Sequence, residues 1–129
     1  MKIKILFLLL FMLLSTVTAL EAQNKTEVNS KQAITLLQKD SKLIVLDVRT
    51  PEEFKEGHIK GAVNIDIRQE DAFRKIDKLD RKAKYLVYCR TNHRSGIAVD
   101  HMIQSGFMNV YQMIDGFPGW VANKLAVQK

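Results

Sequence analysis

Short apolar runs recur along this chain. Between them lie stretches in which the apolar residues have helical spacing. Residues 43–48 and 85–88 are mostly aliphatic or aromatic runs bounded by polar residues, as expected of strands buried on both faces. Residues 62–67 alternate between apolar and polar positions and predict a second strand, and residues 109–114 predict a further one.

Helices are expected between and after these strands. Asn29 and Gln32 form a capping pair for the first helix, and Ser95 is expected to cap the fourth. The predicted helical segments cover residues 29–37, 51–54, 70–79, 95–106 and 118–127. Because strands alternate with helices, the pattern predicts an α/β fold with a parallel sheet covered on both faces.

Residues 1–22 have the pattern of a secretory signal peptide. Two lysines precede an unbroken apolar run over residues 5–14, and small and polar residues follow it. Cleavage is expected after Ala19 or after Ala22. An uncleaved anchor is the alternative, but the run is shorter than the roughly 20 residues of a spanning helix. We therefore expect an exported, bacterial periplasmic protein with a mature domain over residues 23–129 and no stable membrane span after cleavage.

Composition and charge narrow the class of protein further. Apolar residues make up 47% of the chain and charged residues 26%, which fits one globular domain. The formal net charge is +6, but acids and bases are interspersed and no basic stripe contains aromatic residues. This distribution argues against nucleic-acid binding and suits small anionic substrates. The polar residues 23–27 predict an N-terminal tail of the mature chain.

Cys89 is the only cysteine, which excludes an intramolecular disulfide. On its own, a lone cysteine fits a buried core thiol and a reactive thiol equally well. Cys89 follows the predicted strand 85–88 and precedes a predicted helix, and ligands of open α/β sheets bind beyond the carboxyl ends of the strands. Backbone N–H groups in this loop and the following helix N-terminus can stabilise a thiolate, a persulfide or a bound oxyanion.

The side chains of this loop suit such an anion. Arg90 and Arg94 can lower the pKa of the Cys89 thiol, and Arg94 can bind an oxyanion with two hydrogen bonds. Asn92 is expected to adopt a positive φ in a tight loop, which asparagine tolerates well. His93 either faces solvent or donates a hydrogen bond to a substrate.

Three stretches of the chain together resemble the rhodanese-like sulfurtransferases. The loop Cys-Arg-Thr-Asn-His-Arg-Ser at residues 89–95 resembles the family's active-site loop. Residues 46–65, with LDVRTPEEF, GHI and GAVNI, resemble its N-terminal signature. Residues 106–120, with GFMNVY, a glycine and a tryptophan, resemble its C-terminal signature. The resemblance covers residues 28–125 and implies a single domain whose central parallel sheet has about five strands.

The resemblance also implies an activity. Cys89 would be the catalytic nucleophile that carries sulfur as a persulfide, with a thiosulfate-like anion as donor and a thiol or cyanide as acceptor. No metal and no organic cofactor is implied. The implied substrate-binding residues are Arg90, Thr91, Asn92, His93, Arg94 and Ser95. The family commonly has glycine at the position of Asn92, so the donor and the rate are open.

Several alternatives stay open at this point. Asp47 and Arg49 either support the Cys89 loop from below, with Arg49 near the substrate, or form a structural ion pair. His58 is expected to form a structural hydrogen bond in support of the site. A persulfide carrier for a partner protein, including a thiol-redox protein, is the second function. An oxyanion phosphatase or arsenate-type reductase is the third. The related dual-specificity phosphatases have a loop one residue longer than the one between Cys89 and Arg94. The shorter loop of this chain favours sulfur transfer over phosphate chemistry.

Overall fold

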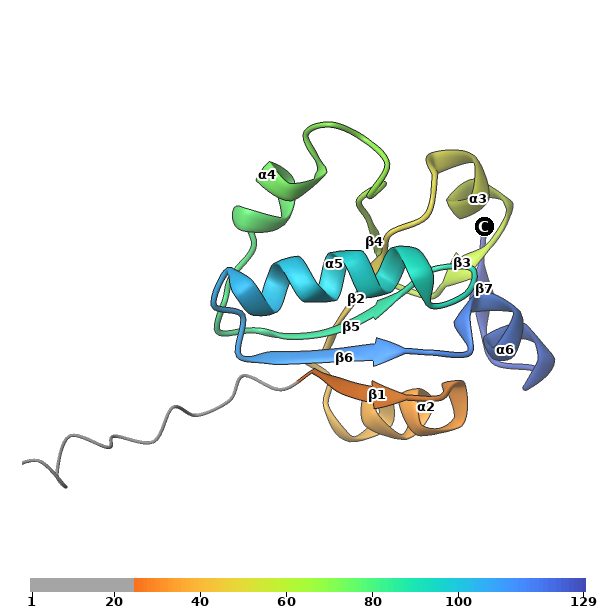
Figure 1. The fold of residues 1–129 in the computed structure, drawn as a ribbon. Helices are drawn as coiled ribbons and strands as arrows, with labels where there is room; N and C mark the ends of the chain where they lie inside the picture. The colour runs from red at the N-terminus through yellow and green to blue at the C-terminus, as the bar shows by residue number, and fades with distance from the viewer. Residues whose placement is uncertain (1–24) are drawn as a thin grey trace, which may run out of the picture.

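The structure, a computed structural model, describes residues 25–129. Five parallel strands form its central sheet in the order β1-β6-β5-β2-β4, which confirms the predicted α/β fold and strand number (Figure 1). The strands are β1 (Thr26–Val28), β2 (Ile44–Asp47), β4 (Val63–Asn64), β5 (Lys84–Tyr88) and β6 (Asn109–Met113). The predicted signal peptide lies outside the described residues.

Helices cover both faces of the sheet (Figure 1). They are α2 (Ser30–Lys39), α4 (Ala72–Asp77), α5 (His93–Gln104) and α6 (Gly116–Ala122). Tyr85 and Val87 of β5 pack in one buried cluster with α4 and α5, whereas Leu86 and Tyr88 pack in a second cluster with α2 and α6. Successive side chains of a strand point to opposite faces, so this one strand anchors both halves of the core. Cys89 continues the alternation and belongs to the α4–α5 cluster.

Short elements follow the carboxyl end of β2. Helix α3 (Pro51–Glu56) begins at the N-cap residue Thr50, and strand β3 (His58–Ile59) pairs antiparallel with the C-terminal strand β7 (Val127–Gln128). Thr50 and Glu53 form a capping box, in which Thr50 Oγ1 accepts from Glu53 N at 3.2 Å. These elements lie beside the end of β5 from which Cys89 emerges (Figure 1).

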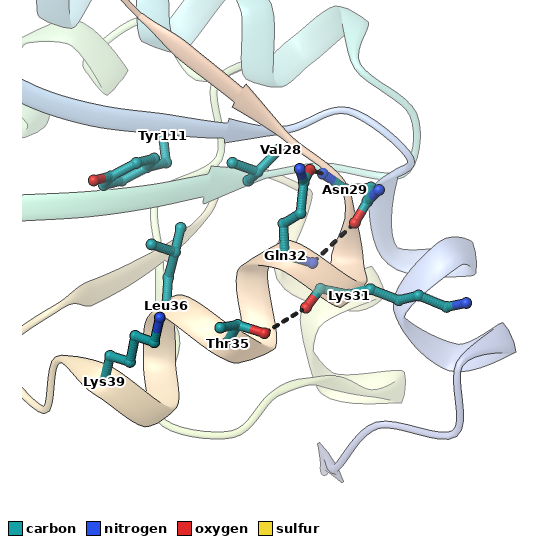
Figure 2. A pocket seen from close by; sticks show the side chains of 8 residues that line it. All are labelled: Val28, Asn29, Lys31, Gln32, Thr35, Leu36, Lys39 and Tyr111. Atoms are coloured by element: carbon teal, nitrogen blue, oxygen red, sulfur yellow. Dashed lines mark hydrogen bonds between the residues drawn. The ribbon is translucent and has the colours of Figure 1, made fainter.

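The capping pair predicted for the first helix is present. Asn29 Oδ1 accepts from Gln32 N, and Gln32 Oε1 accepts from Asn29 N, both at 2.9 Å. Helix α2 then extends to Lys39, slightly beyond the predicted end at residue 37. A groove of about 500 Å³ lies beside this helix, as Figure 2 shows. Its lining residues come from β1, α2 with its N-cap Asn29, and β6, and none belongs to the Cys89 loop.

Three predicted segments differ from the observed elements. The tail expected over residues 23–27 overlaps the edge strand β1. In β1, Val28 is buried while Thr26 and Glu27 are exposed, so no apolar pattern marks the strand. The strand predicted over residues 62–67 is only Val63–Asn64. The last helix ends at Ala122 rather than near residue 127, because Lys124 adopts a φ of 54° and breaks the helical path.

Candidate active site

Cys89 lies directly after β5, which is flanked by β2 and β6 in the middle of the sheet. Its side chain is fully buried. The loop after it turns back so that Ser95 N donates to Cys89 Sγ at 3.3 Å, and Ser95 Oγ lies 3.5 Å from the same sulfur. A backbone N–H in the first turn of α5 therefore points at the thiol, in the direction in which a helix N-terminus stabilises negative charge.

The start of α5 differs from the prediction. Asn92, not Ser95, is the N-cap residue, and Ser95 is the third residue of the helix. Asn92 has a φ of −135°, so the expected positive φ was wrong. The reason is that Asn92 O already accepts from Gly96 N at 3.0 Å, which makes Asn92 the half-helical residue before the first turn rather than the residue that turns the loop.

The rest of the loop is open to solvent. Arg90, Thr91, Asn92 and His93 are exposed, and Thr91 Oγ1 accepts from His93 N at 3.3 Å. The exposure of His93 agrees with the solvent-facing alternative. The His93 amide is thus already bonded, whereas the Ser95 amide is the one that contacts the sulfur.

Arg94 is held by a residue that the sequence did not single out. Its guanidinium donates to both carboxylate oxygens of Glu53, at 2.7 and 3.0 Å. This bond from Arg94 lowers the pKa of Glu53 to about 2 and raises the pKa of Arg94. Because Thr50 fixes Glu53 through the capping box, Arg94 joins α5 to α3 beside the thiol. The role predicted for Arg94 at a bound oxyanion stays a prediction.

Asp47 and Arg49 form a buried ion pair, as the structural alternative predicted. Arg49 Nη2 lies 2.7 Å from Asp47 Oδ2 and donates to the carbonyl oxygen of Gly57 at 2.7 Å. Tyr88 Oη donates to the same Asp47 carboxylate, and burial together with that carboxylate raises the pKa of Tyr88 well above its usual value. The Arg49 guanidinium also lies 4.2 Å from the ring centre of Phe117.

His58 forms the hydrogen bond expected of a structural histidine. Its Nδ1 lies 2.8 Å from the carbonyl oxygen of Phe54, and the two rings stack with centres 3.6 Å apart. The ring joins β3 to α3, at the same side of the molecule as the Asp47–Arg49 pair.

The sequence of this chain is similar to known proteins over most of the described residues. A family model described as the Rhodanese-like domain matches residues 30–123. The chain belongs to this family. A Thiosulfate sulfurtransferase GlpE of Pseudomonas putida is 35% identical over 92 residues, which cover 71% of this chain and 81% of that protein. The protein of the same name from Coxiella burnetii is 30% identical over 87 residues, covering 67% and 79%.

Solved structures of rhodanese-like proteins share the fold. A rhodanese-related protein from Thermoplasma volcanium has a TM-score of 0.70 at 29% identity and covers 80% of this chain and 97% of its own. The rhodanese-like domain of an Anabaena protein has a TM-score of 0.72 at 22% identity, covering 81% and 80%. These likenesses establish that the layers and sheet order described above are those of a rhodanese-like domain.

Two further residues shape the Cys89 loop of this rhodanese-like domain. Gln112 Nε2, on β6, donates to Asn92 O at 2.9 Å and to Ser95 Oγ at 3.1 Å. Gly116 has a φ of 63°, and a Cβ there would lie 2.2 Å from Arg90 O. A polar residue inside the apolar run 109–114 is the signal that marks Gln112, but sequence alone does not say which loop it meets.

A pocket of about 420 Å³ with mixed charge lies beside the start of the Cys89 loop, where Arg90 lines it. Its lining residues are Arg49, Glu53, Glu56, Gly57, Arg90, Phe117 and Pro118. Within residues 25–129, no carboxylate lies within ion-pair distance of Arg90, so this exposed guanidinium is available to a small anion in the pocket.

Residues 25–129 contain no group of three or more His, Cys, Asp or Glu side chains that could hold a metal ion. Among the helices of the same residues, none has the length and apolar character needed to cross a bilayer. Among the candidate site residues, the structure brings the Cys89 thiol together with the backbone N–H and the hydroxyl of Ser95.

Proposed function

We propose that this protein is a sulfurtransferase that moves sulfane sulfur from thiosulfate or a related donor to a thiophilic acceptor through a Cys89 persulfide. The observation that carries the proposal is the position of Cys89 Sγ at the end of the central strand, 3.3 Å from the Ser95 amide of α5. Family membership and relatives named thiosulfate sulfurtransferase support the same activity.

In the first step, the Cys89 thiolate attacks the outer sulfur of thiosulfate. A sulfur–sulfur bond forms at Cys89, the sulfur–sulfur bond of thiosulfate breaks, and sulfite leaves with the electron pair. Charge is conserved in this step. The thiolate carries one negative charge and thiosulfate two, and afterwards the persulfide carries one and sulfite two. The Ser95 N–H and the first turn of α5 stabilise the anionic sulfur throughout.

In the second step, a nucleophile attacks the outer sulfur of the persulfide. Cyanide takes that sulfur to form thiocyanate, or a thiolate takes it to form a new persulfide, and the Cys89 thiolate is regenerated. Because Cys89 is fully buried, the exposed loop residues 90–93 must move before a sulfur donor or an alkylating reagent can reach its sulfur. Arg90, which follows Cys89 directly and lines the neighbouring pocket, can hold the remaining oxyanion of the donor.

The proposal also includes the place where this reaction runs. The N-terminal pattern of two lysines, an apolar run and small residues supports export to a bacterial periplasm. In an oxidising compartment the Cys89 thiol needs a reducing partner protein, because the chain has no second cysteine that could reduce an oxidised Cys89. A thiol-redox protein is the partner of matching chemistry, and the acceptor in the second step can be the same protein.

The test is the intact mass of the purified protein after incubation with thiosulfate, beside the Cys89→Ser variant. We expect a gain of one sulfur atom in the wild type, no gain in the variant, and loss of the added mass on treatment with cyanide. Sulfur gained with slow turnover until a thiol protein is added would identify a carrier. No gain with thiosulfate or other sulfane donors would overturn the proposal.

A further inference from the structure

Gln112 has an unusual environment for a polar residue on the central sheet. It lies on β6 with only 3% of its surface exposed, on the face that packs against α5. Within residues 25–129, its Oε1 is buried without a hydrogen-bond donor, whereas its Nε2 donates twice. A buried oxygen left without a partner destabilises the fold, so packing alone does not account for a glutamine at this position.

The two acceptors of Gln112 Nε2 are both in contact with the Cys89 environment. Ser95 Oγ lies 3.5 Å from Cys89 Sγ and 3.2 Å from Asn92 O, so its single proton has two possible acceptors. When Cys89 is a thiol, its S–H donates to Ser95 Oγ, and the Ser95 hydroxyl donates to Asn92 O. When the thiol gives its proton to solvent, the sulfur needs donors instead.

Gln112 makes the second arrangement favourable. It occupies one acceptor position of Ser95 Oγ and also donates to Asn92 O, which Gly96 N bonds as well. Asn92 O therefore stays satisfied when the Ser95 hydroxyl turns away from it. The remaining direction for that proton is toward the Cys89 sulfur, where it joins the Ser95 N–H.

We infer that Gln112 is a positioning residue that turns the Ser95 hydroxyl toward Cys89 Sγ when the thiol ionises. Gln112 does not touch the sulfur; it acts through Ser95. Only the benefit of this arrangement for sulfur transfer rests on the proposed function. There, a hydrogen-bond donor to the thiolate would also stabilise the persulfide anion that follows.

The test uses the pH profile of Cys89 alkylation by iodoacetamide, which reports this thiol alone because the chain has one cysteine. We expect Gln112→Met to move the midpoint of the profile upward by roughly 1–2 pH units, the size of one hydrogen bond to a charged group. Ser95→Ala should move it by a similar amount. The double variant should move it no further than Ser95→Ala, because both residues act through the same hydroxyl.

A merely structural role for Gln112 gives a different pattern. Under our inference, the thermal midpoint of Q112M should not fall, because methionine has a similar shape and removes the unpaired oxygen. Gln104→Met, on the exposed side of α5, is the matched control. An unchanged alkylation midpoint in Q112M, or a double-variant shift equal to the sum of the single shifts, would overturn the inference. Should Q112M unfold, Gln112→Asn, which is too short to reach both acceptors, is expected to give the same shift. Alkylation needs no sulfur donor, so its outcome is independent of the thiosulfate mass test.

Discussion

Gly116 controls how closely the segment after β6 approaches the Cys89 loop. Its φ is 63°, and a Cβ at this position would stand 2.2 Å from Arg90 O, so the space admits hydrogen alone. The next residue, Phe117, uses that approach to donate its N–H to Cys89 O at 2.9 Å. One residue without a side chain thus fixes the backbone next to Cys89.

We expect Gly116→Ala to lower the free energy of unfolding by about 3 kcal/mol or more, because backbone strain and a steric clash act together. Sulfur loading of Cys89 should fall in the same variant. Chemical denaturation and the thiosulfate mass assay measure the two effects. Gly61→Ala is the control: its φ is 79° but no atom lies within 4 Å of the added Cβ, so strain alone should cost about 1 kcal/mol. Equal losses in both variants would contradict the role of the close contact.

At the scale of elements, the Arg94–Glu53 ion pair joins helices α3 and α5 beside the Cys89 loop. Thr50 begins α3 and holds Glu53, and Glu53 holds Arg94 in the first turn of α5. The pair brings together residues 41 positions apart along the chain. Arg94 is therefore placed by α3 as well as by its own loop.

Replacing Glu53 by glutamine should weaken this link. The pKa of Glu53 is about 2 in the folded protein, below its ordinary value of 4.5, so the stabilisation is complete above about pH 4.5 and disappears as the pH falls toward 2. Because the pair is partly open to solvent, we expect a loss of about 1 kcal/mol at pH 7. Denaturation curves of wild type and E53Q should converge in acid. Glu52→Gln, in the same turn, should show no such pH-dependent difference.

Elements with a strong local pattern were the ones that the sequence predicted well. The capping pair at Asn29, the buried strand before Cys89 and the parallel sheet all follow from short-range rules. Strand β1 and the small β3–β7 sheet were missed because their residues are mostly exposed or paired with distant segments. The partners of the site residues were missed for the same reason, since Glu53 and Gln112 meet the loop only after the chain has folded.

At the scale of the whole molecule, the buried Asp47–Arg49 pair ties the sheet to the segment that covers its end. Asp47 closes β2, Arg49 reaches the Gly57 carbonyl, and Tyr88 of β5 donates a hydrogen bond to the same carboxylate. Tyr88 Oη also accepts from Ile59 N at 3.1 Å, which brings β3 into the network. Loss of one charge here affects several elements at once.

We expect Asp47→Asn to lower the free energy of unfolding by about 3 kcal/mol, because it leaves the Arg49 charge buried without its counter-ion. Asp100→Asn is the matched control, since its contact with Lys25 is 3.8 Å long and exposed, and its effect should stay within about 0.5 kcal/mol. Urea denaturation of the two variants at neutral pH decides between a structural pair and a dispensable one. Equal stabilities would contradict the structural role.

The sheet order has a consequence for how the chain folds. β1 has β6 as its neighbour in the sheet, and the adjoining Ser30 N bonds to Asp115, 85 residues further along. Such distant pairing makes folding slow, because a long loop must close before the contact forms. During synthesis β1 therefore has no partner until residues 109–113 have been made. An export signal in residues 1–22 would be recognised on a chain whose sheet is still incomplete, while that chain can pass through a narrow pore.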